Sequence, residues 1–300
     1  MIEDRIDGAT LDGVAATCLW TLRNRAEESR HPGSVFADPL AERLQRRISY
    51  DYARFGKPDQ IHPLRAAALD FALRAYLDRH PAATVVALGE GLQTTYWRLG
   101  RPAVDWRLGR PAVDWLSVDL PPVIDLRRRV LPPEPRVTSI PASALDRAWL
   151  AAPDPARGVF ISAEGLFMYL ERDDVLALIA DCAARFPGGQ LFFDSIPPWL
   201  SRRTLKSGPR GRPPFSTSPE GTDNSGLRLS AGYTVPPMPF GLTVSEAARL
   251  LGRIPGVAAV ADVQPPPGRG AWRPGTLRRL ANLPGLRDLR PSITLVTFAG

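Results

Sequence analysis

Five short apolar runs alternate with helical stretches between residues 84 and 194, and no other feature of the sequence constrains the fold as much. We expect buried strands at 84–89, 116–120, 136–140, 158–162 and 190–194. Helices are expected between several of them, notably over 122–130 and 172–185. Strands that alternate with helices form a parallel sheet covered on both faces. Two later apolar runs, 257–263 and 292–298, could complete this sheet.

The first eighty residues have helical periodicity instead. Apolar residues recur at helical spacing from Leu11 to Leu22, and a break follows at residues 31–33. Asp38 is expected to be the N-cap of a second helix that begins at Pro39. A third helix is expected over 64–77. The pattern therefore predicts a helical cap over residues 1–80 and an α/β core over 81–300, within one structural domain.

Two segments interrupt this organisation. Residues 201–240 hold many Pro, Gly and Ser residues and little periodicity, so either a lid over the ligand edge of the sheet or a disordered insertion fits. Residues 97–105 recur unchanged as residues 106–114, as expected of an in-frame duplication or a sequence-assembly error. This repeat precedes the second strand, at the edge of the sheet away from the ligands. We expect a surface bulge with no effect on the chemistry.

Composition excludes several classes of protein. The 300 residues are 44% hydrophobic, which supports a sizeable core, and no stretch approaches the roughly 20 apolar residues of a membrane span. The N-terminus lacks the features of a signal peptide, so we expect a cytoplasmic protein. Its cysteines, Cys18 and Cys182, lack metal-ligand spacing and are expected to be reduced core thiols, with no metal site. The net charge of +7 comes from dispersed arginines, which favours a solvated basic surface over a nucleic-acid interface.

The first expected strand leads into a glycine turn. Gly89 and Gly91 flank Glu90, and such a turn lets a backbone approach a ligand at the carboxyl edge of a parallel sheet. Thr94 stands where a dinucleotide fingerprint has its third glycine, which disfavours a nicotinamide cofactor. A plain turn at the end of a strand is the alternative.

Polar residues follow the next strands at the same edge. Asp119, which precedes Leu120, can accept hydrogen bonds from both hydroxyls of a ribose. The presence of this carboxylate together with the glycine turn indicates an adenosine-containing ligand. The loop 143–146 could contact an adenine edge or cap a helix. Glu164 follows the fourth strand and must be paired or face a ligand, because unpaired burial of a carboxylate is costly. A structural carboxylate that caps a helix is the alternative there.

With these motifs in place, the chain resembles a known family, the leucine carboxyl methyltransferase family of S-adenosylmethionine-dependent enzymes. Within it, the bacterial branch with polyketide O-methyltransferases of the tetracenomycin type is more similar. The matching stretches, in order and spacing, are residues 17–26, 36–40, 64–70, 85–94, 115–120, 143–146 and 163–170.

The resemblance implies a class I methyltransferase fold: a Rossmann-like seven-stranded sheet with an N-terminal helical cap. It implies S-adenosylmethionine as cofactor and a small molecule as methyl acceptor. The residues it implies for the cofactor site are Arg65 and Arg25 at the carboxylate, Gly89, Glu90 and Gly91 along the amino-acid part, Asp119 and Leu120 at the ribose, Ser143, Ala144 and Leu145 around the adenine, and Glu164 near the amino end. Where the family often has Asp-Thr-Arg after the glycine turn, this sequence has Gln93-Thr94-Thr95, so the contacts of that turn stay open.

The resemblance leaves the acceptor open between a carboxylate and a hydroxyl. Glu164 and Tyr169 are the candidate catalytic residues. His80 precedes the first strand and is expected to be structural, and we expect His31 and His62 on the surface. A lack of placed bases favours a carboxylate acceptor or catalysis by proximity alone. The alternatives are a nicotinamide-dependent oxidoreductase, which would need a Tyr-x-x-x-Lys pair that the chain lacks, and a cofactor-binding homologue without turnover.

Overall fold

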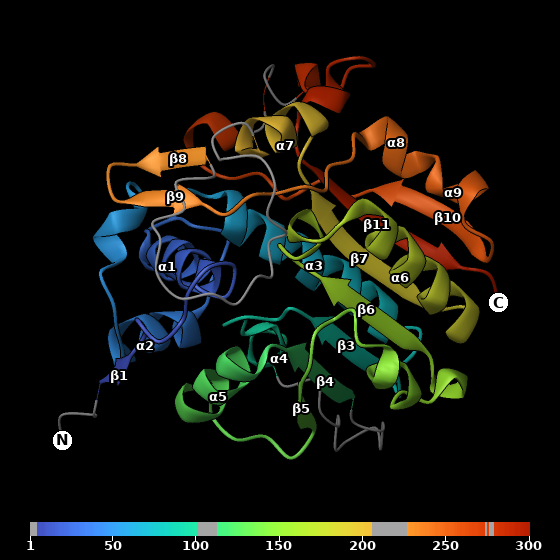
Figure 1. The fold of residues 1–300 in the computed structure, drawn as a ribbon, viewed down its shortest axis with the longest axis horizontal. Helices are drawn as coiled ribbons and strands as arrows, with labels where there is room; N and C mark the ends of the chain where they lie inside the picture. Colours follow the sequence, from blue (N-terminus) through green and yellow to red (C-terminus); the bar gives the residue numbers. More distant parts are fainter. Residues whose placement is uncertain (1–4, 101–112, 206–226, 274, 276–278) are drawn as a thin grey trace.

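A seven-stranded sheet forms the centre of the molecule in the computed structural model, which describes residues 5–100, 113–205, 227–273, 275 and 279–300 (Figure 1). Most of the nine-residue repeat and the middle of the expected insertion lie outside the described residues. The strands are β3 (Thr84–Leu88), β4 (Asp114–Asp119), β5 (Val137–Pro141), β6 (Val159–Ala163), β7 (Gln190–Ser195), β10 (Val257–Asp262) and β11 (Ser292–Phe298).

The strand order is β10-β11-β7-β6-β3-β4-β5, with β11 antiparallel to both of its neighbours. The chain moves outward from β3 to β4 and β5, and then returns to β6 on the other side of β3. Ligands bind at such a reversal, outside the carboxyl ends of the strands. The expected class I methyltransferase sheet is confirmed, including its two late strands.

Two helical layers cover this sheet. The described helices are α1 (Thr17–Arg30), α2 (Pro39–Arg47), α3 (Ile61–Leu77), α4 (Thr95–Arg98), α5 (Pro121–Val130), α6 (Arg172–Arg185), α7 (Pro198–Leu205), α8 (Val244–Ala248) and α9 (Leu250–Arg253). Leu69 and Leu73 of α3 pack against one face of the sheet. Leu178 and Ile179 of α6 pack against the other, because alternate strand residues point to opposite faces.

The N-terminal helices pack beside the carboxyl edge of the sheet. Leu19 and Leu22 of α1 join Leu44 of α2 in a core that continues into α5 at Leu126. Asp38 caps α2 as expected, since its carboxylate accepts a hydrogen bond from the backbone N–H of Ala41 at 2.9 Å. This arrangement brings α1 and α3 over the edge where ligands would bind (Figure 1).

Some elements differ from the expectation. Helix α1 begins at Thr17, so the first part of the predicted periodic stretch forms turns. Two short strand pairs were not predicted: β1 (Ile6–Asp7) with β2 (Ile48–Ser49), and β8 (Leu227–Ser230) with β9 (Tyr233–Val235). Strands of two to four residues are too short for a periodic signal. No helix in the described part of the chain combines the length and the apolar character needed to cross a membrane.

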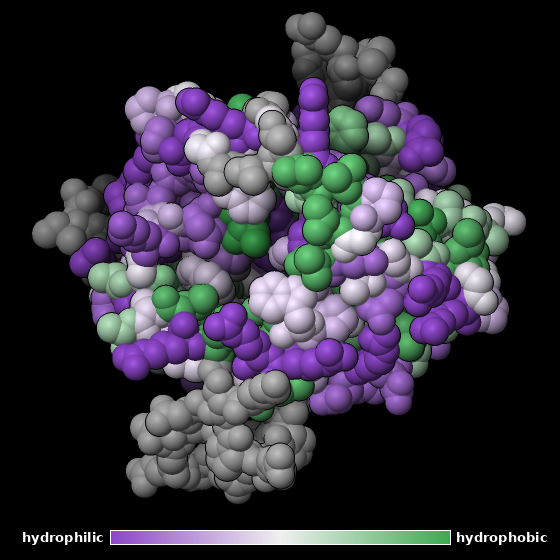
Figure 2. Space-filling view, turned by 90° about the horizontal axis from the view of Figure 1, so that it is seen from above, coloured by the Kyte–Doolittle hydropathy of each residue, from purple (hydrophilic) through white to green (hydrophobic). Residues whose placement is uncertain are grey.

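The face seen from above is mostly hydrophilic, with a band of hydrophobic side chains near its centre (Figure 2). The segment at this end of the molecule carries several exposed leucines, which are Leu280, Leu283, Leu286 and Leu289. Helices α1, α3 and α7 and the β8–β9 hairpin line a cavity at this end of the molecule.

Candidate active site

The glycine turn after β3 presents bare backbone to a cleft. Gly89 and Gly91 have φ angles of +58° and +55°, in the left-handed region that favours glycine. A Cβ on Gly89 would lie 2.8 Å from Leu166 Cδ1, and one on Gly91 would lie 2.9 Å from Cys18 Cβ. Conformation and space therefore both require glycine at these two positions.

Strand register places Asp119 beside this turn. Leu88 pairs with Val118, so the residues that follow them, Gly89 and Asp119, leave the sheet side by side. Asp119 Oδ2 accepts a hydrogen bond from the Gly91 N–H at 2.6 Å, and Oδ1 accepts one from its neighbour Leu120 at 2.7 Å. Burial raises the pKa of Asp119, and these two N–H donors oppose that shift. Each oxygen retains acceptor capacity for a ligand hydroxyl.

The Glu90 side chain turns away from the cleft. It accepts a hydrogen bond from Trp115 Nε1 at 3.1 Å and forms an ion pair with Arg127 at 2.7 Å. Arg127 also donates to the Gly91 carbonyl at 2.5 Å. Glu90 therefore supports the turn from behind, and only its backbone is placed to meet a ligand.

Arg65 of α3 lies between two carboxylates. Its Nε donates to Glu164 Oε1 at 2.9 Å, and its Nη1 donates to Asp194 Oδ2 at 2.8 Å. Both acids raise the pKa of Arg65 against the opposing effect of burial, so it stays charged. Glu164 Oε2 is buried and has no hydrogen-bond partner among the described residues, so it can accept from a ligand.

Asp194 was not predicted from the sequence. Its Oδ1 accepts a hydrogen bond from the backbone N–H of Gly165 at 2.6 Å, which fixes the turn after β6. Ala163 pairs with Phe193, so Glu164 and Asp194 also emerge side by side. The register argument that located Asp119 would have located Asp194 if it had been extended to the fifth strand.

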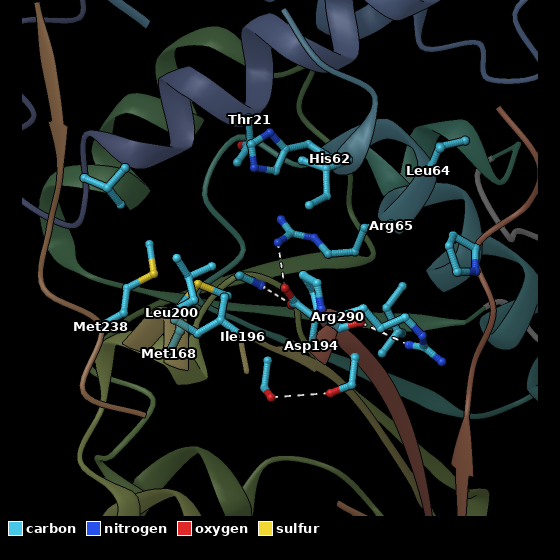
Figure 3. A pocket seen from close by; sticks show the side chains of 18 of the residues that line it. Thr21, His62, Leu64, Arg65, Met168, Asp194, Ile196, Leu200, Met238 and Arg290 are labelled. Carbon is cyan, nitrogen blue, oxygen red and sulfur yellow. Dashed lines mark hydrogen bonds and ion pairs between the residues drawn. The ribbon is translucent and has the colours of Figure 1, made fainter. Parts of the chain in front are cut away.

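Two cavities meet at Arg65. A narrow cleft of about 100 Å³ runs along the glycine turn, and Arg65 also lines a larger cavity of about 530 Å³. Figure 3 shows the larger cavity. The predicted residues that line the narrow cleft are Arg65, Gly89, Glu90, Gly91, Asp119, Leu120, Ser143, Ala144, Glu164 and Tyr169. Leu145 does not line it and packs partly buried against the core.

Five residues line both cavities: Thr17, Thr21, Arg65, Gly165 and Tyr169. The larger cavity is mainly apolar, with Met168, Ile196, Leu200 and Met238 gathered at one side of Figure 3. The arrangement therefore joins a polar cleft with acidic side chains to an apolar chamber through one shared wall.

Tyr169 keeps its proton at this wall. Burial raises its pKa to about 12, against the opposing effect of a hydrogen bond with Thr17. Near pH 7 its phenol is neutral and can orient a group, but it cannot remove a proton.

Arg25 lies outside both cavities, contrary to its suggested contact with a cofactor carboxylate. Its Nη1 is 2.6 Å from Asp38 Oδ2, and its Nη2 donates to the Leu92 carbonyl at 2.7 Å. The side chain is fully buried. Arg25 therefore holds the end of the glycine turn and does not reach the cleft.

His62 is not on the surface, so the expectation for this residue was wrong. It is 7% exposed, lines the larger cavity and contacts Trp20 edge-on at 4.7 Å between ring centroids. Its Nδ1 lies 2.8 Å from Asn24 Nδ2. No sequence pattern indicates this partner, which is 38 positions away on α1. His31 is exposed, and His80 stacks on Tyr76 at 4.4 Å as a structural residue would.

In the part of the chain that the structure describes, no three His, Cys, Asp or Glu side chains cluster as metal ligands would. Arg65 bonds to both Glu164 and Asp194, and Asp194 also accepts a hydrogen bond from the Gly165 backbone.

The chain is similar in sequence to known methyltransferases. The family model described as leucine carboxyl methyltransferase matches residues 18–183. The chain is 35% identical over 195 residues to the tetracenomycin polyketide synthesis O-methyltransferase TcmP of Streptomyces glaucescens, covering 64% of this chain and 69% of that protein. It is 28% identical over 209 residues to the S-adenosyl-L-methionine-dependent methyltransferase dpfgK of Gibberella zeae, covering 62% and 67%. A crystal structure of a proposed methyltransferase from Thermobifida fusca YX aligns with a TM-score of 0.49 at 18% identity, over 87% of this chain and 88% of that one.

Proposed function

The chain belongs to the leucine carboxyl methyltransferase family and is an S-adenosylmethionine-dependent methyltransferase, and from that premise we propose that it methylates an oxygen atom of a small apolar molecule. The nicotinamide-dependent alternative is thereby overturned. What the family does not fix is the acceptor, and the larger cavity supports our proposal for it.

The residues of the narrow cleft fit the cofactor. We propose that Asp119 accepts hydrogen bonds from the ribose hydroxyls and that the free Oε2 of Glu164 accepts from the amino group. Asp119, Glu164 and Asp194 together outweigh the charge of Arg65, so the site favours a ligand with net positive charge. The bound cofactor would supply an electrophilic methyl group on a sulfonium.

The acceptor would occupy the larger cavity. Its volume of about 530 Å³ and its mainly apolar lining suit a mainly apolar molecule with few polar groups. Polyketide aromatic systems have this character, and TcmP is by its name an enzyme of polyketide synthesis. We propose a polyketide or similar secondary metabolite, with a carboxylate or a hydroxyl as the methylated group.

The contribution of this chain to methyl transfer is to position the attacking oxygen and the methyl group. Methyl transfer is an in-line displacement whose rate depends on holding the attacking oxygen near the methyl group. The shared wall of Thr17, Thr21, Arg65, Gly165 and Tyr169 is where an oxygen in the larger cavity would meet a ligand in the narrow cleft. This shared wall is the single observation that carries the proposal.

Further parts of the proposal concern the surroundings of the site. Thr204, Leu227 and Val235 line the larger cavity, so the described ends of the expected insertion would form one of its walls. We place the enzyme in the cytoplasm, because Cys18 and Cys182 are both free and buried, as is usual in a reducing compartment.

Calorimetry and mass spectrometry test this proposal together. We expect the protein to bind S-adenosylmethionine and S-adenosylhomocysteine. From a panel of aromatic acids, phenols and the matched amines and thiols, we expect it to convert acids or phenols into products one CH2 heavier. Cofactor binding without any product across the panel would point to a non-catalytic homologue. Products only from amines or thiols would contradict the oxygen acceptor.

A further inference from the structure

We propose that His62 is the residue that binds the acceptor oxygen, as a neutral hydrogen-bond donor whose orientation Asn24 fixes. This inference rests on the proposed function, because it assigns a role within the acceptor cavity. It concerns a residue that neither the sequence patterns nor the resemblance singled out for the site.

The position of His62 relative to Arg65 is the first step. The two residues are three positions apart on α3 and therefore lie on the same face of the helix. Arg65 belongs to the shared wall, whereas His62 lines only the larger cavity. Figure 3 shows the imidazole projecting over the cavity above the Arg65 guanidinium. The His62 side chain and the acceptor side of the shared wall thus border the same cavity.

Asn24 determines which ring nitrogen carries the proton. Its Nδ2 lies 2.8 Å from His62 Nδ1, and an amide nitrogen can only donate. The amide is held in this orientation because the same NH2 group also faces the Asp59 carboxylate, which can only accept. His62 Nδ1 must therefore accept, which leaves the proton of the neutral imidazole on Nε2. Asn24 is itself fully buried on α1, and the edge-on contact with Trp20 restrains the ring further. Nε2–H is the remaining polar group of a ring held on two sides.

The surroundings keep His62 neutral. Burial lowers its pKa well below the ordinary value, and Arg65 and Arg25 lower it further. A group in this environment resists accepting a proton, so His62 is poorly suited to act as a general base. It can donate one hydrogen bond into a mainly apolar cavity, where an unpaired polar group is costly and a matching oxygen is therefore selected.

Two substitutions separate a donor from a base. His62→Gln places an amide N–H near the position of Nε2, whereas His62→Phe keeps the ring packing on Trp20 and removes the donor. The probes are anthracene-2-carboxylate, 2-hydroxyanthracene and 2-methylanthracene, which share one apolar body without other oxygen atoms. We expect His62→Phe to weaken binding of the two oxygenated probes by about tenfold or more, the loss of one hydrogen bond, and to leave the methyl probe unchanged.

Turnover and NMR supply independent readouts. With an acceptor that the wild type methylates, His62→Gln should retain most of the turnover and His62→Phe should lose it. Heteronuclear NMR of the three histidines, assigned with the His62→Gln variant, should show the His62 proton on Nε2 near neutral pH. Equal loss in both variants, recovering at high pH, would instead identify His62 as a general base and overturn the proposal.

Failure of the inference can be told apart from failure of the proposed function. His62 does not line the narrow cleft, so both variants should bind S-adenosylhomocysteine as the wild type does. If the wild type does not bind this ligand, the proposed function fails. If it does, and His62→Phe binds the oxygenated probes unchanged, only the inference on His62 fails. A wild type that binds none of the three probes contradicts both the inference and the acceptor class.

Discussion

Asp119 is bonded at both oxygens to the backbone of the site, and this makes it a sensitive residue to change. The substitution Asp119→Asn would turn an NH2 group toward one of the two N–H donors, from Gly91 or Leu120. We expect affinity for S-adenosylhomocysteine to fall by about 2 kcal/mol, roughly thirtyfold, since hydrogen bonds to a charged group are lost. Titration calorimetry measures this directly.

The matched control is Asp125→Asn. Its carboxylate lies on α5, near Asp119 in sequence, but its side chain is 70% exposed. The same chemical change there should leave affinity unaltered. Equal binding by both variants would mean that Asp119 does not contact the cofactor, and the assignment of the narrow cleft would have to change.

His62 also makes a prediction for stability. Its pKa is lowered in the folded protein, so below about pH 6.5 the unfolded chain binds a proton that the folded chain does not. Stability contributed by neutral His62 is therefore present near pH 7 and is lost on acidification, by at most about 1.4 kcal/mol per pH unit. The positive groups that act on it are Arg65 and Arg25.

Urea unfolding near pH 7 and pH 5 tests this linkage. The wild type should lose stability over this range more steeply than His62→Phe, which has no group to titrate at that position. Buried acids such as Glu164 have raised pKa values and add a pH dependence of the opposite sign, but it is common to both proteins and cancels in the comparison. Identical slopes would show that His62 is protonated alike in both states.

At the scale of elements, a buried ionic network joins the cap to the glycine turn. Arg25 of α1 contacts Asp38 at the start of α2, and Arg98 of α4 lies 3.2 Å from the same carboxylate. Thr94 also donates to it, at 2.6 Å. Helices from three parts of the chain therefore meet at one acid, and the end of the glycine turn is bonded into the same cluster. This chain has Gln93-Thr94-Thr95 where the family often has Asp-Thr-Arg, and Thr94 of this sequence is bonded into the cluster.

Removing Arg25 should be costly. In Arg25→Met, Asp38 keeps only part of its pairing, and loss of one partner from a buried pair costs about 3 kcal/mol. We expect this loss in the free energy of unfolding, together with weaker binding of S-adenosylhomocysteine, because the Leu92 carbonyl loses its donor. Adding Asp38→Asn should restore part of the stability, since the buried carboxylate that has lost one of its two arginines is then replaced by a neutral amide.

Arg30→Met is the control for that prediction. Arg30 lies on the same helix and pairs with Glu27 at 3.1 Å, but both side chains are more than a third exposed. An exposed pair contributes less than about 1 kcal/mol. Comparable losses in the Arg25 and Arg30 variants would contradict the special role of the buried network.

The sequence predicted elements better than the contacts between them. Strand ends follow from apolar runs, and parallel register then brings Gly89, Asp119 and Glu164 to one edge without any knowledge of side chains. The inward position of His62 could not be inferred this way. Helix α3 is buried on several sides, so its apolar pattern does not say which face meets a cavity, and the partner Asn24 is far away in the chain.

Across the whole molecule, the site lies at one edge of the sheet and the described end of the repeat lies at the other. The site occupies the carboxyl ends of β3, β4, β6 and β7, whereas Asp114, the last residue of the nine-residue repeat, lies at the opposite end of β4. Asp114 begins that strand, five residues before Asp119, which corresponds to about 16 Å along an extended chain. Substitutions near Asp114 should therefore alter the stability of the fold and leave the affinity for the cofactor unchanged.

Deletion of residues 106–114 tests this separation. Because the two copies are identical, Val104 and Asp105 would follow directly into Trp115 and take the places of Val113 and Asp114. Val113 is buried, and Asp114 pairs with Arg136 at 2.9 Å and Arg157 at 2.8 Å, so the shortened chain retains the residue types for each of these contacts.

We expect the deleted protein to bind S-adenosylhomocysteine as the full chain does. The shorter connection between α4 and β4 should leave stability equal or raise it by about 1 kcal/mol, because closing a shorter loop costs less entropy. Calorimetry and urea unfolding measure the two quantities separately. Lost affinity with unchanged stability would place the repeat in communication with the site, which the opposite edges of the sheet argue against. Lost stability with normal affinity would instead show that residues 99–104 alone cannot span from α4 to β4, a failure of the loop and not of the site.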